Sequence, residues 1–368
     1  MIELAQRTTR IDSSGIRKVF ALAADMVDPV NLSIGEPHFD VPQSVKDVVI
    51  AAIADGRNSY TLTAGIPELR ARLLELYRER RVQAEDVIVT SGVSGGILLS
   101  FLALLNEGDE VIIPDPYFVM YKHLANFIGA KPVFVDTYPD FQLDPDRIDA
   151  AVTPRTKIIV VNSPNNPTGA VYTESVLRGI SEVAERHGLT IMTDEIYDCF
   201  LYDSKPISIA EWYPQTIVLS GFSKSMAMTG WRIGYALAPK SIVAALANIQ
   251  MYSFVCAPSV AQWAALAALD KDTSINKNLY QKKRDLIYSG IRDRYEVICP
   301  GGAFYIFPQA PNGDGDTFVA EAIRNNLLIV PGSVFSERKT HFRISYAAED
   351  EMIRRGVEIL NTLAERYT

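Results

Sequence analysis

The sequence predicts an α/β fold: a three-layer sandwich with a mostly parallel seven-stranded sheet, joined to a smaller α+β domain. Between about residues 86 and 238, seven short apolar runs alternate with helix-length amphipathic segments. The runs are uniformly apolar rather than alternating, which is typical of strands that helices cover on both faces. At 368 residues the chain is also long for one compact core, so we expect a large and a small domain.

The seven predicted strands are short runs rich in Val, Ile and Leu. In chain order they are 87–89, 111–113, 133–135, 158–161, 190–192, 217–219 and 233–237. Polar and turn-forming residues follow directly, as in Thr90-Ser91-Gly92 and Asp194-Glu195. Ligands of open parallel sheets bind beyond the carboxyl ends of the strands, so we expect a site at that edge.

The small domain is predicted from a change in the sequence pattern beyond about residue 271. Helical segments rich in Lys and Arg alternate there with two strand-like runs, 301–307 and 341–346. The segment 349–367 predicts an amphipathic helix, with an apolar side made of Met352, Ile353, Val357, Leu360 and Leu363. We therefore assign residues 41–270 to the large domain, and residues 1–40 together with 271–368 to the small one.

Composition and charge narrow the class of protein. With 48% hydrophobic and 22% charged residues, the chain has the composition of an ordinary globular protein. A net charge of −8 disfavours nucleic-acid binding, which needs clustered Lys and Arg. No apolar run reaches the length of a membrane span, and the first residues carry no targeting pattern. The three scattered cysteines fit neither a metal site nor a full disulfide framework. We expect a cytoplasmic protein with no metal and no membrane or nucleic-acid partner.

Lys224 is the first candidate for chemistry, because it lies just past the predicted strand 217–219. A buried ammonium group is costly unless it is paired or deprotonated for covalent work, whereas an arbitrary lysine would reach solvent. Arg232, framed by two glycines, suits bidentate recognition of a phosphate, and Ser223 offers a hydroxyl to the same group. A nucleophilic lysine beside a phosphate clamp suggests a phosphorylated carbonyl cofactor.

The pattern Ser-Lys-x-x-x-x-x-Gly-Trp-Arg-x-Gly, which starts at Ser223, resembles the cofactor-lysine signature of the class I and II aminotransferases, the fold-type I pyridoxal-phosphate enzymes. The resemblance extends over nearly the whole chain, with the motifs in the family's order. It implies an aspartate-aminotransferase-like fold and pyridoxal 5′-phosphate held as a Schiff base on Lys224. It also implies a ping-pong transfer of an amino group from an L-amino acid to a 2-oxo acid.

Two further motifs supply partners for the cofactor ring. The segment 163–169, Ser-Pro-Asn-Asn-Pro-Thr-Gly, would alone be turn chemistry. The resemblance implies that its Asn166 donates a hydrogen bond to the cofactor's phenolic oxygen. Asp194 matches the aspartate that keeps the pyridine nitrogen protonated, and Tyr197 matches a tyrosine that bonds the phenolic oxygen. Without these neighbours, Asp194 would be typical of a solvated helix start.

Small residues at 90–96 lead into an apolar helix, so free backbone amides at its start can face an anion. We assign the backbone of Val93 and Ser94, with the Ser94 hydroxyl, to the phosphate; a plain N-cap by the same serine is the alternative. Gly221 stands where relatives often carry a phosphate-binding serine. That contact is therefore missing, or supplied by Ser220 or water.

The segment 114–121 resembles the family's loop that places an aromatic ring on the face of the cofactor. Position favours Phe118 for this ring, with Tyr117 as the second choice. Core packing is the ordinary role of an aromatic residue near a strand end.

Three features bear on substrate and assembly. Arg343 matches the arginine that pairs with the substrate α-carboxylate, although an isolated arginine would more often be a structural ion-pair partner. Residues 33–37 resemble the segment that closes over the substrate, where Gly35 brings backbone close to the carboxylate, and Asn166 also lies at the substrate. Tyr60 resembles a tyrosine that reaches the phosphate of the neighbouring subunit, which implies a homodimer with shared active sites.

Two other functions stay open at this point. A β-lyase uses the same scaffold, and a ligand-sensing domain would keep the site without turnover. The acidic charge and the position of the first motif, near Ser33, disfavour the fusion to a DNA-binding module that such sensors carry. The donor side chain is also open: Trp231, Tyr121, Phe222 and Tyr252 suggest an apolar pocket, and core packing explains them equally well.

Overall fold

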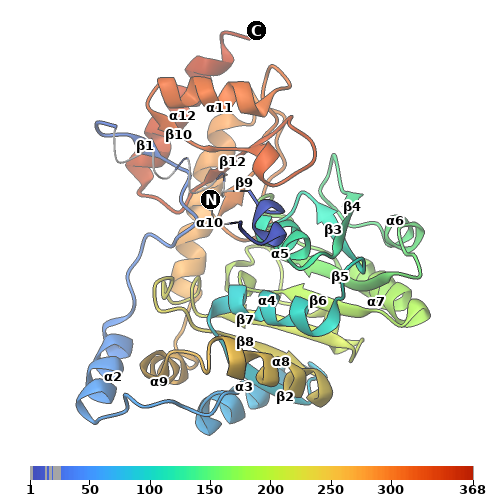
Figure 1. Ribbon diagram of the computed structural model, residues 1–368. Helices are drawn as coiled ribbons and strands as arrows, with labels where there is room; N and C mark the ends of the chain where they lie inside the picture. The colour runs from blue at the N-terminus through green and yellow to red at the C-terminus, as the bar shows by residue number, and fades with distance from the viewer. Residues whose placement is uncertain (1–2, 13–14, 16–18, 20–25, 368) are drawn as a thin grey trace.

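The structure is a computed structural model that describes residues 3–12, 15, 19 and 26–367. Within the predicted N-terminal segment 1–40, residues 1–2, 13–14, 16–18 and 20–25 lie outside the described part, as does residue 368. A wide lower part of the molecule is built around one large sheet, and a smaller part sits above it (Figure 1). The long helix α10 (Ser274–Ile291) runs through the smaller part towards the large one.

The large sheet contains all seven predicted strands. They are β2 (Asp86–Thr90), β3 (Glu110–Asp115), β4 (Lys131–Asp136), β5 (Thr156–Asn162), β6 (Thr190–Asp194), β7 (Thr216–Gly221) and β8 (Gly234–Ala238). Their order in space is β2-β8-β7-β6-β5-β3-β4. Only β8 runs antiparallel to its two neighbours, and the other pairs of the sheet are parallel. The predicted mostly parallel sheet is confirmed.

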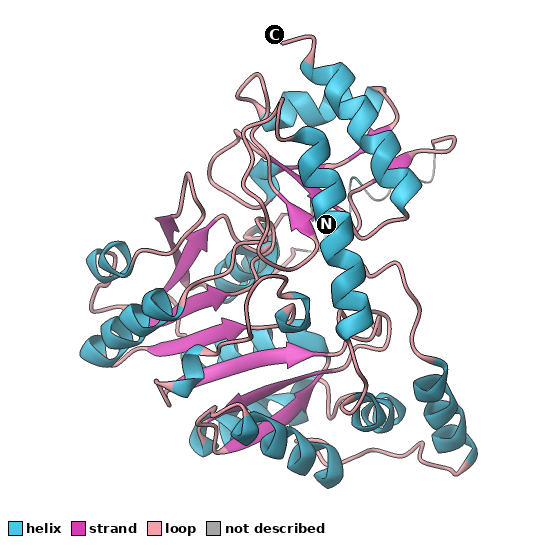
Figure 2. Ribbon diagram, turned by 180° about the vertical axis from the view of Figure 1, so that it is seen from behind, coloured by secondary structure: helices cyan, strands magenta, loops and turns pink. Residues whose placement is uncertain are grey.

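Helices cover both faces of this sheet and give the predicted three layers (Figure 2). One face packs against α4 (Gly92–Leu104), α5 (Val119–Ile128) and α8 (Lys240–Ser253). The other face packs against α3 (Pro67–Glu79), α9 (Ser259–Ala268), α6 (Pro145–Ala150) and α7 (Glu174–His187), with α2 (Gln43–Ala54) outside α9. Successive strand residues point to opposite faces. Both faces are buried, so the strands are apolar at every position.

The smaller part combines three helices with two small sheets. The helices are α10, α11 (Gly315–Arg324) and α12 (Asp350–Ala364). Strands β11 (Val330–Pro331), β12 (Phe342–Ser345) and β9 (Tyr305–Ile306) form one sheet, and β1 (Val30–Asn31) pairs with β10 (Leu327–Leu328). The predicted C-terminal helix is confirmed as α12. Its Ile353, Leu360 and Leu363 are fully buried, whereas Met352 and Val357 are only partly so.

The strand β9 is shorter than the predicted run 301–307. Gly301 and Gly302 both donate their backbone N–H to the carbonyl of Gly169, and Ala303 has a left-handed φ of +57°. These residues therefore form a turn against the loop after β5, and pairing with β12 begins only at Tyr305.

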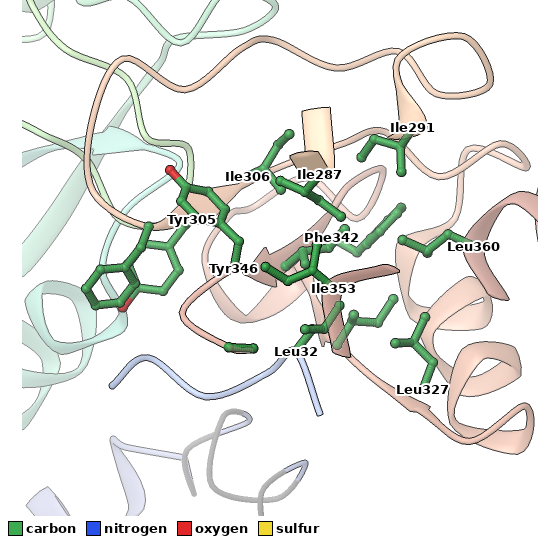
Figure 3. Packing of buried hydrophobic residues seen from close by; sticks show 14 of the residues in the cluster. Leu32, Ile287, Ile291, Tyr305, Ile306, Leu327, Phe342, Tyr346, Ile353 and Leu360 are labelled. Carbon is green, nitrogen blue, oxygen red and sulfur yellow. The ribbon is translucent and has the colours of Figure 1, made fainter. Parts of the chain in front are cut away.

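One hydrophobic cluster joins the two parts of the molecule. It is centred on residues such as Leu32, Ile287 and Phe342 of the smaller part (Figure 3). The loop after β6 adds Tyr197 and Phe200 to the same cluster, and the Tyr197 ring lies edge-to-face on Phe304 at 5.3 Å. The loop that carries predicted site residues is thus held in the core of the smaller part.

Two features are absent from the described residues. No helix there is both long enough and apolar enough to cross a membrane. No group of three or more His, Cys, Asp or Glu side chains in those ranges is arranged to hold a metal ion. The three cysteines, Cys199, Cys256 and Cys299, are unpaired.

Candidate active site

The predicted site residues meet at one edge of the large sheet. Strands β5, β6 and β7 end there at Asn162, Asp194 and Gly221, and the reversed strand β8 begins there at Gly234. The loops at this edge enclose a cavity of about 710 Å³. Every predicted site residue except Tyr60 lines it: Gly35, Val93, Ser94, Phe118, Asn166, Asp194, Tyr197, Ser223, Lys224, Arg232 and Arg343.

Lys224 projects into the cavity from the loop after β7 and is half-buried. Its Nζ donates a hydrogen bond to the carbonyl of Gly35 at 2.6 Å. Burial lowers the pKa of Lys224 to about 8; Glu36 opposes that shift, and the guanidinium groups of Arg343 and Arg232 reinforce it. An appreciable fraction of this amine is therefore uncharged near neutral pH, as a nucleophile or base requires.

Asp194 is a buried carboxylate at the end of β6. Its Oδ2 accepts a hydrogen bond from the Tyr121 hydroxyl at 2.7 Å, and its Oδ1 accepts one from the Ile196 N–H at 3.2 Å. Burial raises the pKa of Asp194 to about 6 in spite of these donors. Because a desolvated carboxylate is stabilised by a cation, this group suits a protonated ring nitrogen.

The start of α4 offers a site for an anion. The helix begins at Gly92, and Ser91 at the N-cap position makes no side-chain capping bond. Ser94 lies inside the first turn, so the alternative that it is a plain N-cap is wrong. Arg232 packs directly on this helix start: a Cβ atom added to Gly92 would lie 2.6 Å from Arg232 Nη2. Free amides beside a guanidinium group suit a phosphate.

The glycine at position 221 has a packing reason. A Cβ atom there would lie 2.9 Å from the Cα of Gly234 and 3.0 Å from the carbonyl oxygen of Ile233. A serine would therefore push β7 away from β8. Ser220 does not line the cavity, and its hydroxyl bonds Tyr235 instead. Of the three alternatives for this contact, the one from Ser220 is therefore disfavoured, and a missing contact or a water stays open.

Phe118, not Tyr117, lines the cavity. The Phe118 ring stands edge-to-face to Tyr121, with centroids 5.8 Å apart. Tyr117 instead stacks on Phe134 at 4.9 Å and donates its hydroxyl to Glu337 at 2.7 Å. Of the two candidates, only Phe118 is placed to contact a bound ring.

Arg343 is almost completely buried, with 1% of its surface exposed. Its Nη1 donates to Asn166 Oδ1 at 3.0 Å and its Nη2 donates to the carbonyl of Ser33 at 2.8 Å. The Nε group is buried with no hydrogen-bond partner among the described residues. Burial lowers the pKa of Arg343. A buried guanidinium group that meets only neutral oxygens is suited to an incoming carboxylate.

Several lining residues were not predicted. Tyr305 is the main one: its hydroxyl lies 2.8 Å from that of Tyr197, and a Cβ atom on Gly35 would lie 2.5 Å from it. The others are Ser33, Ile34, Glu36, Asn162, Ile196, Thr229 and Gly230. Tyr305 lies in the run 301–307, where the strand pattern alone gives no reason to separate it from core aromatics. Most of the rest are direct neighbours of predicted residues.

Tyr60 lies outside the cavity, and 84% of its surface is exposed. The aromatic residues that suggested an apolar pocket do not line the cavity either. Phe222 is buried in the cluster that contains α3 and α9, the half-buried Trp231 packs against that cluster, and Tyr252 is 90% exposed. Tyr121 is buried and bonds Asp194. Core packing or surface exposure, not pocket lining, accounts for these aromatics.

The sequence profile described as "Aminotransferase class I and II" matches residues 27–360. A probable aspartate aminotransferase of Methanocaldococcus jannaschii is 38% identical over 98% of this chain and its own full length. An aspartate/prephenate aminotransferase of Thermus thermophilus is 38% identical over 93% of this chain and 92% of its own.

Solved structures agree with these matches. Aspartate aminotransferase from Thermus thermophilus, solved with maleate, superposes with a TM-score of 0.95 at 36% identity, covering 99% of this chain and all of that one. An aromatic aminotransferase from Pyrococcus horikoshii superposes with a TM-score of 0.89 at 33% identity, covering 95% of this chain and 99% of that one.

Proposed function

We propose, from the premise that the chain belongs to the aminotransferase class I and II family, that the cavity beyond β5, β6 and β7 is its active site. The protein is an aminotransferase that depends on pyridoxal 5′-phosphate and moves an amino group from an amino acid to a 2-oxo acid. The observation that carries the site assignment is that Lys224, Asp194, Arg232 and Arg343 line one cavity.

Charged and polar groups of the cavity match both ends of the cofactor, its phosphate and its ring nitrogen. Arg232, the Ser223 hydroxyl and the amides at the start of α4, Val93 and Ser94, would hold the phosphate. Asp194 would face the ring nitrogen at the other end. When bound, the cofactor supplies an electron-withdrawing ring that accepts the electron pair released at the donor's Cα atom.

The sides of the ring have partners as well. Asn166 uses its amide oxygen to hold Arg343, which leaves its NH₂ group to donate to the phenolic oxygen. The Tyr197 hydroxyl, which now meets Tyr305, would contact the same oxygen. Phe118 would cover one face of the ring.

Lys224 would have two roles, both carried by its Nζ atom. Its amine would anchor the cofactor covalently between turnovers and, once free, would take the proton from the donor's Cα atom. A pKa of about 8 supports both roles, because the uncharged amine is accessible at neutral pH. Arg343 would hold the α-carboxylate and so orient the Cα–H bond towards Lys224. Donor and acceptor would occupy the same cavity in turn, which predicts ping-pong kinetics.

Reductive trapping tests the assignment. Borohydride treatment of the holoenzyme, followed by peptide mass mapping, should place the cofactor on the peptide that carries Lys224. The variant Lys224→Ala should bind the cofactor without trapping it and lose nearly all turnover, while Lys122→Ala, which removes a surface lysine paired with Glu337, should behave like the unmodified enzyme. Trapping on another lysine, or full turnover by Lys224→Ala, would overturn the proposal.

Assembly, domain division and location complete the proposal. The exposed Tyr60 would reach the phosphate in a second copy of the chain, forming a homodimer with shared sites. Residues 41–270 would form the large domain, with 1–40 and 271–368 forming the small one. A cytoplasmic location is supported by the three unpaired cysteines.

A further inference from the structure

The charges on the cavity wall bear on which amino donors it accepts, a question that rests on the proposed function. Among the described residues that line the cavity, the cations are Lys224, Arg232 and Arg343. The proposed function commits all three: to the amine, to the phosphate and to the α-carboxylate. A donor with a carboxylate in its side chain would bring a further anion into this space. An anion buried without a partner is strongly disfavoured.

The wall also carries aliphatic side chains. Ile34 lies between Ser33, whose carbonyl accepts from Arg343, and Gly35, whose carbonyl accepts from Lys224. A donor that is held by Arg343, with its Cα–H bond towards Lys224, therefore lies against the segment that carries Ile34. Val93 and Ile196 are the other aliphatic residues of the wall.

Ile34 differs from these two in its packing. Val93 and Ile196 both belong to hydrophobic clusters that hold the fold together. Ile34 is half-buried, lines the cavity and belongs to none of the four clusters found among the described residues. Its apolar surface is thus available to a substrate side chain, which would bury it further.

The surface around Tyr60, which the proposed homodimer would bring to the neighbouring site, exposes several apolar groups. Gln250 links the end of α8 to this segment through a 2.6 Å bond to the carbonyl of Thr63. The exposed side chains around that link include Leu62, Tyr252, Phe254 and Val255. The nearby Arg57 guanidinium group lies over the Trp263 ring at 3.8 Å.

We infer that this enzyme selects amino donors with uncharged, apolar side chains over donors with a side-chain carboxylate, and that Ile34 is a specificity-determining residue. This preference differs from the aspartate named for several of its relatives. It follows from the lack of a further cation on the described wall and from the unpacked aliphatic surface of Ile34 beside the donor.

The first test uses the unmodified holoenzyme and one amino donor at a time, with no acceptor. The rate at which the cofactor is converted to its amino form is followed by absorbance for leucine, phenylalanine, aspartate, asparagine, glutamate and glutamine. Leucine and phenylalanine should react roughly tenfold or more faster than aspartate and glutamate, at equal concentration below saturation. Faster reaction of aspartate or glutamate than of leucine and phenylalanine would overturn the inference. Conversion by none of the donors would instead overturn the proposed function.

The second test changes the charge at position 34. Ile34→Lys should raise the ratio of the aspartate rate to the asparagine rate by roughly tenfold, because the new ammonium group compensates the side-chain carboxylate. The uncharged control Ile34→Met should leave that ratio unchanged. Ile34→Ala should slow leucine and phenylalanine severalfold and leave aspartate unaffected, since it removes only apolar contact. Equal ratios in all variants, each with cofactor bound, would remove Ile34 from the specificity determinants.

Discussion

At the scale of single residues, the hydrogen bond from Tyr121 to Asp194 helps to decide the pH at which the Asp194 carboxyl group is ionised. Burial alone would keep the carboxyl group protonated over a wide pH range, and the Tyr121 hydroxyl counteracts this by donating to the ionised form. Because its pKa is about 6, Asp194 is ionised above that pH and loses its charge as the pH falls through it. A cofactor that needs an anionic partner should bind best above pH 6.

This contact gives a pH prediction. Tyr121→Phe removes a donor to the carboxylate, so the pKa of Asp194 should rise by about one unit and cofactor affinity should be lost at higher pH than in the unmodified chain. Absorbance titrations of the cofactor between pH 5 and 9 measure the midpoint. Tyr117→Phe is the control, since its hydroxyl bonds Glu337 outside the cavity. A midpoint that stays in place or moves to lower pH contradicts the interpretation.

Several of the residues that could be predicted lie in short motifs at or just after the ends of strands. Lys224, Asp194 and Asn166 are set by local sequence, and their strands deliver them to one edge of the sheet. Tyr305 and the donor role of Tyr121 could not be predicted in this way. Their hydroxyls meet Tyr197 and Asp194 across more than 70 residues of chain, and such pairings exist only once helices and strands have packed.

At the scale of elements, close packing between β7, β8 and α4 positions the start of α4, the end of the cavity that is proposed to hold the phosphate. A Cβ atom on Gly234 would lie 2.7 Å from the backbone nitrogen of Val93, so β8 touches the first turn of α4. Gly221 opposes Gly234 in the same sheet. The two glycines let two strands and a helix start approach within backbone contact.

Gly234→Ala should therefore displace the start of α4. We expect cofactor affinity to fall by roughly tenfold and the free energy of unfolding to fall by about 1–3 kcal/mol, the usual cost of overpacking. Equilibrium dialysis and urea unfolding measure the two effects. Gly95→Ala lies in the same helix but meets only an ordinary contact, 3.4 Å to the Ser91 Cβ atom, and should be close to neutral. Similar losses in both variants would count against the packing argument.

Glu195 follows β6, is buried and does not line the cavity; it accepts a hydrogen bond from the Ser208 hydroxyl at 2.6 Å. Burial raises its pKa to about 8, well above the value in an unfolded chain. At pH values between those two pKa values, Glu195 is protonated in the folded chain and ionised in the unfolded chain. Stability contributed by the protonated form is therefore lost as pH rises, by up to about 1.4 kcal/mol per pH unit.

Glu195→Gln should remove this dependence, because the amide does not titrate and keeps a similar shape. Urea unfolding of both proteins between pH 5 and 8 should give a flatter profile for the variant. Parallel profiles would show that Glu195 does not hold the extra proton.

The elements of the large sheet were predictable because each strand is buried on both faces and leaves a continuous apolar run. In the smaller part, β9 was predicted too long. The backbone bonds from Gly301 and Gly302 to Gly169 join segments far apart in the chain, and no local pattern encodes them.

At the scale of the whole molecule, the proposed homodimer assigns the exposed Tyr60 to the site of the neighbouring copy. Tyr60→Ala should fold normally, because the exposed Tyr60 side chain contributes little to the stability of its own subunit. It should bind the cofactor weakly, because the proposed phosphate contact is lost. If it serves the neighbouring site, a hybrid of a Tyr60→Ala subunit with a Lys224→Ala subunit contains one doubly damaged site and one intact site.

Mixing and reassembling the two variants in equal amounts should therefore restore roughly a quarter of the unmodified activity, since half of the dimers are hybrids with one working site. Activity is measured on the dimer fraction, after size separation from monomers and aggregates. No recovery from a mixture shown to contain hybrids would place Tyr60 at its own subunit's site or at none.

The shared hydrophobic cluster has a mechanical consequence. Tyr197 is packed into the core of the smaller part, and that core also fixes the strand that carries Arg343. Any tilt of the smaller part would therefore move two groups together: the guanidinium group proposed to hold the substrate carboxylate and the phenol proposed to contact the cofactor. Under the proposed function, such a movement would change the hydrogen bonds to the cofactor and the hold on the substrate together, so the absorbance of the bound cofactor would report the movement.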